Sequence, residues 1–162
     1  MRVVMALLLW FSLAACTGPR QGAGPTFRAT GLKGDPTILL TASNVTLLVD
    51  VTSPTGIGSA RIEKTSGNWP PQIVMRLRLK GLESLKFTYA DRTVNLEVPS
   101  SGMGGVIESA QVGSGTFAPL TPDSPYWMKV TPGEGYFDVT APPDFFTSGA
   151  DQFVVEWIDF YR

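Results

Sequence analysis

The sequence predicts an all-β protein, a single antiparallel β-sandwich or jelly-roll-like domain of about eight or nine strands. Apolar and polar residues alternate in several short runs, as they do in half-buried strands. Clusters of glycine and proline separate these runs, and no stretch of ten or more residues keeps a helical period. Hydrophobic residues make up 43% of the chain, with nine Phe, four Trp and four Tyr, which is enough to fill one core.

The clearest strands lie in the first half of the domain. Residues 45–51 have an apolar residue at every second position and predict a strand with one mainly buried face. A turn and a short strand at 60–65 follow, and the segment SGNWPP then interrupts the pattern because Pro-Pro does not fit a central ladder. Three further strands, at 73–79, 85–89 and 94–98, are separated by short turns. We therefore expect these three strands to form a meander.

The second half predicts strands with longer connections. Residues 106–112 read as a strand, and those at 126–130 and 136–140 are joined by the hairpin turn PGEG. The segment PPDFF predicts one helical turn. The last strand, 153–161, is largely apolar on both faces, which predicts an interior strand between two covered surfaces.

The N-terminal segment predicts export and lipidation. One positive charge at Arg2 precedes an apolar run, Val3–Leu13, which is shorter than the roughly 20 residues that span a bilayer. The segment LAAC, ending at Cys16, then resembles the lipobox of bacterial lipoproteins. This resemblance implies cleavage before Cys16 and acylation of that cysteine, and two or more acyl chains make a stable anchor. The alternative is an ordinary secretory signal with a chance cysteine near its cleavage site.

The boundaries follow from a change in composition near residue 36. Residues 17–36 carry five glycines and three prolines and show no apolar period, which predicts a flexible tether. The expected organisation is a signal peptide at 1–15, the lipidated cysteine and tether at 16–36, and the β-sandwich domain at 37–162. An edge strand through Phe27–Leu32 is the alternative for part of the tether.

Composition excludes several classes of site. The 13 basic and 14 acidic side chains argue against a nucleic-acid binder. With no histidine and one cysteine, the chain lacks histidine-dependent nucleophile systems, a disulfide framework and the usual zinc ligands. Glu156 and Asp159 fall on opposite strand faces and cannot flank one bond. We therefore predict a non-enzyme without a metal or another cofactor.

A basic row on one strand is the first candidate binding surface. Alternation places Arg76, Arg78 and Lys80 on one sheet face, opposite an apolar face. Such a row suits an anionic polymer or lipid headgroups. The alternative is a solvated face whose charges are balanced by acids on neighbouring strands. The acids expected to balance them are Glu63, Glu83 and Glu97.

Aromatic residues next to prolines form the second candidate surface. Trp69, Tyr126 and Trp127 lie in predicted loops, where exposed rings would stack on sugar rings. The alternative is that loop tryptophans close the ends of a sandwich that has no disulfides.

Four segments of the domain resemble a group of extracytoplasmic β-domain lipoproteins of uncharacterised function. They are GIGSARIEKTSGNWPPQIVMRLRLKGLESL, SPYW, GYFDVTAPPDFF and the terminal EWIDFYR. The resemblance covers residues 52–162 and implies a single β-rich domain outside the cytoplasm. It implies no particular activity.

These observations predict a non-catalytic envelope lipoprotein that is held at a membrane by its lipid and acts through contacts with another envelope protein. The alternative is a module that binds glycans or another envelope polymer through exposed aromatic rings. Thr17 follows the cysteine, where aspartate commonly retains lipoproteins in the inner membrane. We therefore expect the periplasmic face of the outer membrane in a bacterium with two membranes, and the outer leaflet in one with a single membrane.

Overall fold

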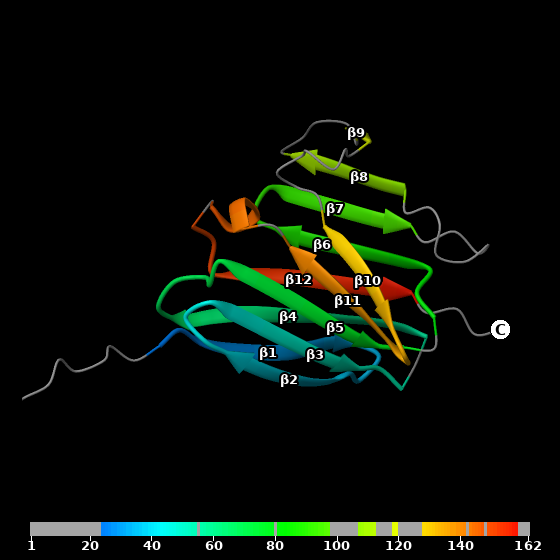
Figure 1. The fold of residues 1–162 in the computed structure, drawn as a ribbon, viewed down its shortest axis with the longest axis horizontal. Coiled ribbons are helices and arrows are strands. Elements are labelled where there is room, and N and C mark those ends of the chain that lie inside the picture. The colour runs from blue at the N-terminus through cyan, green and yellow to red at the C-terminus, as the bar shows by residue number, and fades with distance from the viewer. Residues whose placement is uncertain are drawn as a thin grey trace, which may run out of the picture.

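The structure is a computed structural model of the chain. It describes residues 24–54, 56–79, 81–97, 107–112, 118–119, 128–141, 143–147 and 149–158. These residues form twelve strands and one 3-10 turn, η1 (Pro143–Phe146). The strands lie in two sheets packed face to face (Figure 1), so the predicted β-sandwich is confirmed, with more strands than the predicted eight or nine.

The larger sheet has seven strands in the order β1-β4-β12-β6-β7-β8-β9. All of its neighbouring strands are antiparallel. Its strands are β1 (Thr26–Lys33), β4 (Ile57–Ser66), β12 (Gln152–Ile158), β6 (Ser84–Tyr89), β7 (Arg92–Glu97), β8 (Ile107–Val112) and β9 (Ala118–Pro119).

The smaller sheet has five strands in the order β10-β11-β5-β3-β2. Its one parallel pair, β3 with β5, is an exception to the predicted antiparallel fold. The chain leaves β3 for β4 in the other sheet before it returns to β5, and this crossover lets β3 and β5 run in the same direction. Its strands are β10 (Lys129–Gly133), β11 (Tyr136–Ala141), β5 (Gln72–Arg78), β3 (Thr46–Thr52) and β2 (Thr37–Ala42).

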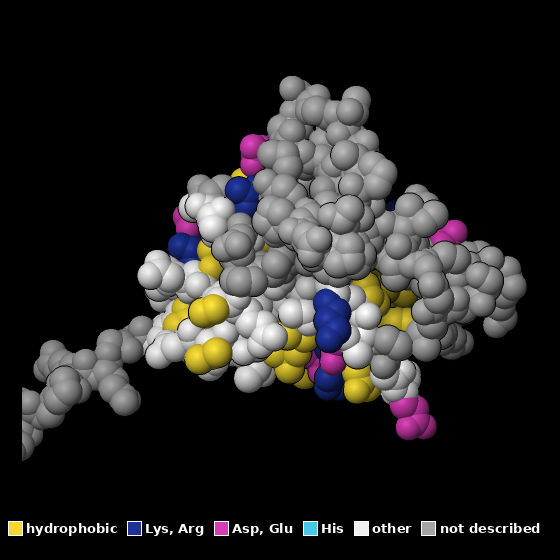
Figure 2. All heavy atoms as spheres, turned by 45° about the horizontal axis from the view of Figure 1, so that its top comes forward, with side chains coloured by type: hydrophobic (Ala, Val, Ile, Leu, Met, Phe, Trp, Pro, Cys, Tyr) yellow, Lys and Arg dark blue, Asp and Glu magenta, His cyan; other side chains and the backbone are white. Residues whose placement is uncertain are grey.

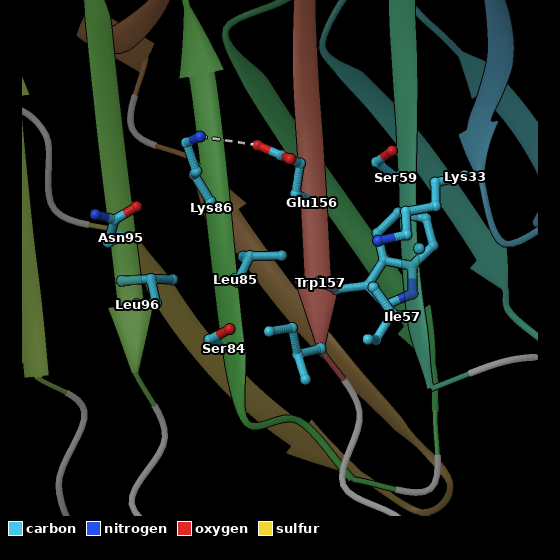
Figure 3. A pocket seen from close by; sticks show the side chains of 12 residues that line it. Lys33, Ile57, Ser59, Ser84, Leu85, Lys86, Asn95, Leu96, Glu156 and Trp157 are labelled. Carbon is cyan, nitrogen blue, oxygen red and sulfur yellow. Dashed lines mark ion pairs between the residues drawn. The ribbon is translucent and has the colours of Figure 1, made fainter.

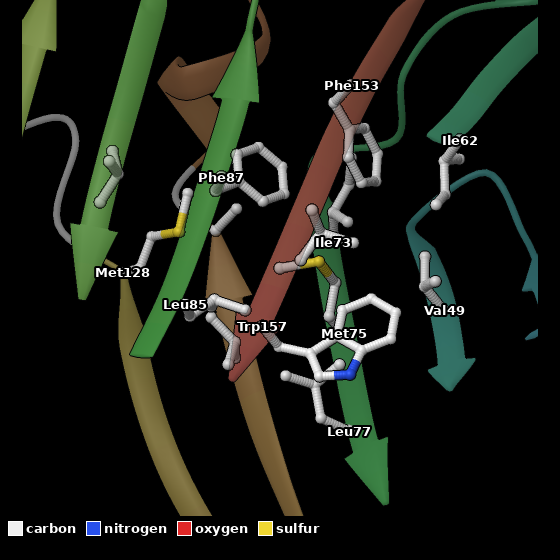
Figure 4. Packing of buried hydrophobic residues seen from close by; sticks show 14 of the residues in the cluster. Val49, Ile62, Ile73, Met75, Leu77, Leu85, Phe87, Met128, Phe153 and Trp157 are labelled. Atoms are coloured by element: carbon white, nitrogen blue, oxygen red, sulfur yellow. The ribbon is translucent and has the colours of Figure 1, made fainter. Parts of the chain in front are cut away.

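The core lies between the two sheets and follows from alternation. Every second residue of β3, β5, β6 and β12 is almost fully buried, while the residues between them face outward. Figure 4 shows these side chains meeting in one cluster, which includes the indole of Trp157. The buried residues of the four strands are Leu47, Val49, Val51, Ile73, Met75, Leu77, Leu85, Phe87, Tyr89, Phe153, Val155 and Trp157.

The predicted three-strand meander is wrong in its first strand. β6 and β7 form the expected hairpin, but β5 lies in the opposite sheet, between β3 and β11. The link from β5 to β6 therefore crosses from one sheet to the other. Leu79 and Leu82, each 5% exposed, bury their side chains in the core along this link. Alternation identifies strands, but it does not say which sheet each strand joins.

The predicted tether is also wrong over Thr26–Lys33, where the alternative of an edge strand is confirmed. These residues form β1, which pairs with β4 at the edge of the seven-stranded sheet. Gly34 and Asp35 both have positive φ angles, 78° and 43°, and turn the chain directly into β2 of the other sheet. The domain thus begins before residue 37. The predicted signal peptide and Cys16 lie outside the described residues.

The last described strand is interior, as predicted, because β12 lies between β4 and β6. The expectation of two covered faces is wrong. Phe153, Val155 and Trp157 are buried, whereas Glu156 is exposed and Ile158 is 39% exposed on the other face. Asp159 lies outside the described residues.

Among the residues that the structure describes, no helix has the length and apolar character needed to cross a membrane.

Candidate functional site

Trp69 lies on the link between β4 and β5 and packs into one end of the sandwich. Its ring centroid is 5.2 Å from that of Phe27, 5.3 Å from that of Phe146 and 5.5 Å from that of Phe153. Its indole N–H donates a hydrogen bond of 2.8 Å to the carbonyl of Ala150. These contacts occupy the ring and its polar atom, so the geometry of Trp69 is that of a plug rather than of a sugar-stacking platform.

The rest of this end is built by η1, which confirms the helical turn predicted from PPDFF. The hydroxyl of Tyr89 shares its one hydrogen between the carbonyls of Phe146 and Ala150, 3.3 and 3.1 Å away, so it ties β6 to the segment around η1. The other two candidate stacking residues, Tyr126 and Trp127, lie outside the described residues. Trp69 is therefore the only member of the aromatic set whose position can be compared with the prediction.

The basic row has the predicted orientation. Arg76 and Arg78 point outward from β5. Leu77, which lies between them, and Met75, which precedes Arg76, are fully buried. Lys80, the third predicted member, lies outside the described residues. The structure therefore brings two of the three cations to one surface, on the outer face of the five-stranded sheet.

Both arginines are engaged by aspartates on the flanking strands. Arg76 donates two hydrogen bonds, of 2.8 and 2.7 Å, to the carboxylate of Asp138 on β11. Arg78 donates two, each of 2.8 Å, to Asp50 on β3. Paired, planar contacts of this kind are the stronger class of ion pair. The guanidinium of Arg76 also lies 4.2 Å from the ring centroid of Tyr136.

These acids differ from the predicted ones. Glu63 pairs with Arg28 of β1, and the arginines of β5 use aspartates because β5 lies between β3 and β11. The hydrogen bonds from Arg78 lower the pKa of Asp50, against the opposing effect of burial. Asp50 therefore stays ionised to lower pH than an ordinary aspartate. On the face that Figure 2 shows, basic and acidic side chains of the described residues lie near one another and form no broad patch of one sign. The arrangement is that of a neutralised face.

A hollow of about 350 Å³ lies on the outer face of the seven-stranded sheet. We call it the outer hollow, and Figure 3 shows its side chains on β7, β6, β12 and β4, together with Lys33 at the end of β1. Alternation turns the side chains used below away from the core, whereas Leu85, Leu96 and Trp157, which also line the hollow, are buried in the core. The members used below are Lys33, Ile57, Ser84, Lys86, Glu156 and Ile158.

The outer hollow combines exposed apolar groups with a charged rim. Ile57 and Ile158 are 47% and 39% exposed, although both are large aliphatic residues. Lys86 forms an ion pair of 3.0 Å with Glu156, and both side chains are about half exposed, so this pair contributes little to stability. For Lys33, no ion pair is seen among the described residues. One lysine at the rim thus keeps its positive charge uncompensated by a described neighbour.

Two residues that line the outer hollow, Trp157 and Gly58, lie directly against each other. A Cβ atom at Gly58 would lie 2.2 Å from Cζ2 of Trp157, so only glycine leaves room for the indole. The indole Nε1 of Trp157 is buried and has no hydrogen-bond partner among the described residues. Such an unmade bond is costly, and the strand pairing that fixes the ring must compensate for it.

The outer hollow was missed at the sequence level because its residues come from separate strands and include few unusual types. The one signal was Ile158 on the face of the last strand that also carries Glu156. In the described part of the chain, no three acidic or cysteine residues are placed to hold a metal ion.

The chain matches no protein-family model, no curated protein and no solved structure.

Proposed function

We propose that this protein is a lipid-anchored, extracytoplasmic protein of the bacterial cell envelope whose domain acts through protein contacts, as a structural or accessory factor without catalysis. The observation that carries the proposal is the outer hollow, in which Ile57 and Ile158 are exposed inside a rim of charged side chains. An apolar centre with a polar rim is the usual composition of a protein–protein contact. Anchoring is supported by LAAC at residues 13–16.

The charges of the outer hollow suggest the chemistry of the partner. Glu156 offsets the charge of Lys86, while Lys33 has no described acidic partner. A protein segment that presents an apolar side chain next to a carboxylate would cover the two isoleucines and pair with Lys33. Binding of an anionic polymer by the basic row draws less support, because Asp50 and Asp138 pair with the two described arginines. Binding of glycans by exposed rings also draws less support, because the ring of Trp69 packs against other aromatic rings inside the domain.

The anchoring part predicts that Cys16 carries the lipid. Labelled palmitate should enter the wild-type protein, and Cys16→Ser should abolish the label because it removes the acyl-accepting thiol. Thr17→Asp is the matched control, since it leaves the thiol in place and should keep the label. Label that survives in Cys16→Ser would contradict the proposal. In a bacterium with two membranes, fractionation should place the wild type in the outer membrane and shift Thr17→Asp to the inner one.

The contact part predicts that capture of a partner depends on Lys33. A photoreactive residue at Ser84, which lines the outer hollow, should crosslink to a discrete envelope protein in intact cells. Lys33→Glu should lower this yield about tenfold, which corresponds to about 1.4 kcal/mol, because it places a negative charge against the carboxylate of the partner. Lys129→Glu is the control, since Lys129 is an exposed lysine on β10 of the other sheet.

Equal crosslinking in the two charge-reversal variants would rule out the outer hollow as the contact. The polymer-binding alternative makes a different prediction. The chain would then bind cell-wall preparations or anionic vesicles, and Trp127→Ala or the triple change of Arg76, Arg78 and Lys80 to Gln would reduce that binding. We expect neither variant to change it.

A further inference from the structure

The edges of the two sheets differ in how they are protected against pairing with another chain. An exposed edge strand offers free N–H and C=O groups, and proteins usually block it with charges, prolines or bulges. Among the described strands, β1 and β9 end the larger sheet, and β10 and β2 end the smaller one. Each edge can therefore be compared by its residues and its register.

Three of these four edges carry such protection. β1 has two register shifts along its pairing with β4 and carries Arg28 and Lys33. β10 contains Lys129 and Pro132, and β9 is two residues long and ends in Pro119. A lysine adds charge at an edge, and a proline lacks the N–H that a neighbouring strand would need.

β2 is the exception. Its sequence, TILLTA, has no charged residue and no proline, and it pairs with β3 over its whole length without a register shift. Figure 1 shows β2 at the rim of the five-stranded sheet, where β1 of the other sheet lies beside it without pairing with it. Leu39 at its centre is 65% exposed, whereas Ile38 and Leu40 are partly buried against the core. The strand thus presents an uncharged, regular edge.

Residues 37–41 of β2 are symmetric about Leu39 in residue type, with two aliphatic residues beside it and two threonines beyond them, and Pro36 falls opposite Ala42 at the ends of this register. Ile38 and Leu40 flank Leu39, and Thr37 and Thr41 flank those two. In an antiparallel pair, residues opposite each other lie on the same face of the sheet. Two β2 strands with Leu39 opposite Leu39 would therefore place Ile38 opposite Leu40 on the core side and threonine opposite threonine outside. This symmetry favours a second copy over an unrelated strand.

We propose that β2 pairs antiparallel with β2 of a second copy of this chain, so that two five-stranded sheets join into one continuous sheet across a twofold axis. Such an interface uses the same residues on both partners. No like charges meet in the pairing, because β2 has none, and the nearest acid on β3, Asp50, is already paired with Arg78. This inference does not depend on the lipid anchor or on the outer hollow.

The first test measures the mass of the purified full chain by light scattering, at concentrations up to about 100 μM. The wild type should have the mass of a dimer. Leu39→Lys should halve the measured mass, because it puts a charge at the centre of the pairing. Val45→Lys should leave the mass unchanged, since Val45 is as exposed, at 64%, but precedes β3 and lies outside β2.

The second test uses disulfide formation in the Cys16→Ser background, which has no other cysteine. Leu39→Cys should give a covalent dimer under mild oxidation, since opposed residues of an antiparallel pair lie within reach of a disulfide. Val45→Cys should stay monomeric in the denaturing gel. A monomeric wild type, a dimer that survives Leu39→Lys, or equal crosslinking by the two cysteine variants would each overturn the proposal.

Discussion

A chain that stops after Glu156 is expected not to fold. The truncation removes Trp157 and Ile158 from β12, which lies between β4 and β6 and pairs with both. Trp157 is 1% exposed, and losing a buried tryptophan costs about 3–5 kcal/mol, a large share of the roughly 5–15 kcal/mol that stabilises a typical domain. The loss of two residue pairs in each ladder adds to this. Near-ultraviolet circular dichroism and limited proteolysis should report an unfolded chain.

The matched control for the truncation is the full chain with Trp157→Phe. This variant keeps an aromatic ring and both ladders, so it should unfold cooperatively in urea at a lower midpoint than the wild type. Soluble, protease-resistant protein from the truncated chain would contradict the role assigned to the end of β12.

The second large effect is expected for Gly58→Val. The new Cβ would lie 2.2 Å from Cζ2 and 2.5 Å from Cε2 of Trp157, and paired strands hold both backbones in place. The ring cannot move without leaving the core, so we expect a loss of about 3 kcal/mol or more, at the upper end for an overpacked core. Urea unfolding followed by tryptophan fluorescence measures it.

Two further variants show whether the clash is the cause. Gly24→Ala is the control, because a Cβ there meets only the side chain of Asn44 at 3.4 Å. It should leave stability almost unchanged. Combining Gly58→Ala with Trp157→Leu should cost less than the sum of the two single changes, since each single change alters the same contact. Strict additivity would show that the glycine is required for another reason.

Alternation located most of the strands because the two faces of each sheet differ in polarity. Residues 45–51, 73–79 and 85–89 place nearly all their buried side chains on one face, and strands are found there. β1 was obscured because most of its residues are exposed and it contains a glycine and two basic residues. Its identity as a strand depends on pairing with β4, a long-range contact that local composition does not reveal.

The candidate sites show the same limit. The outward direction of Arg76 and Arg78 follows from a period of two, but their partners follow from strand order. No local pattern indicates that β3 and β11 flank β5 and bring Asp50 and Asp138 within hydrogen-bonding distance. For the same reason Ile158 looked like a core residue, whereas it faces the outer hollow.

The position of β12 also determines when the chain can fold. The seven-stranded sheet lacks its third strand until residues 152–158 have been synthesised, so β4 and β6 have no strand to bridge them before then. A growing chain therefore cannot complete its core, and pairing across such long stretches of sequence is slow in any case. Folding of the seven-stranded sheet is therefore expected to finish only after the last of its strands along the chain, β12, has been made.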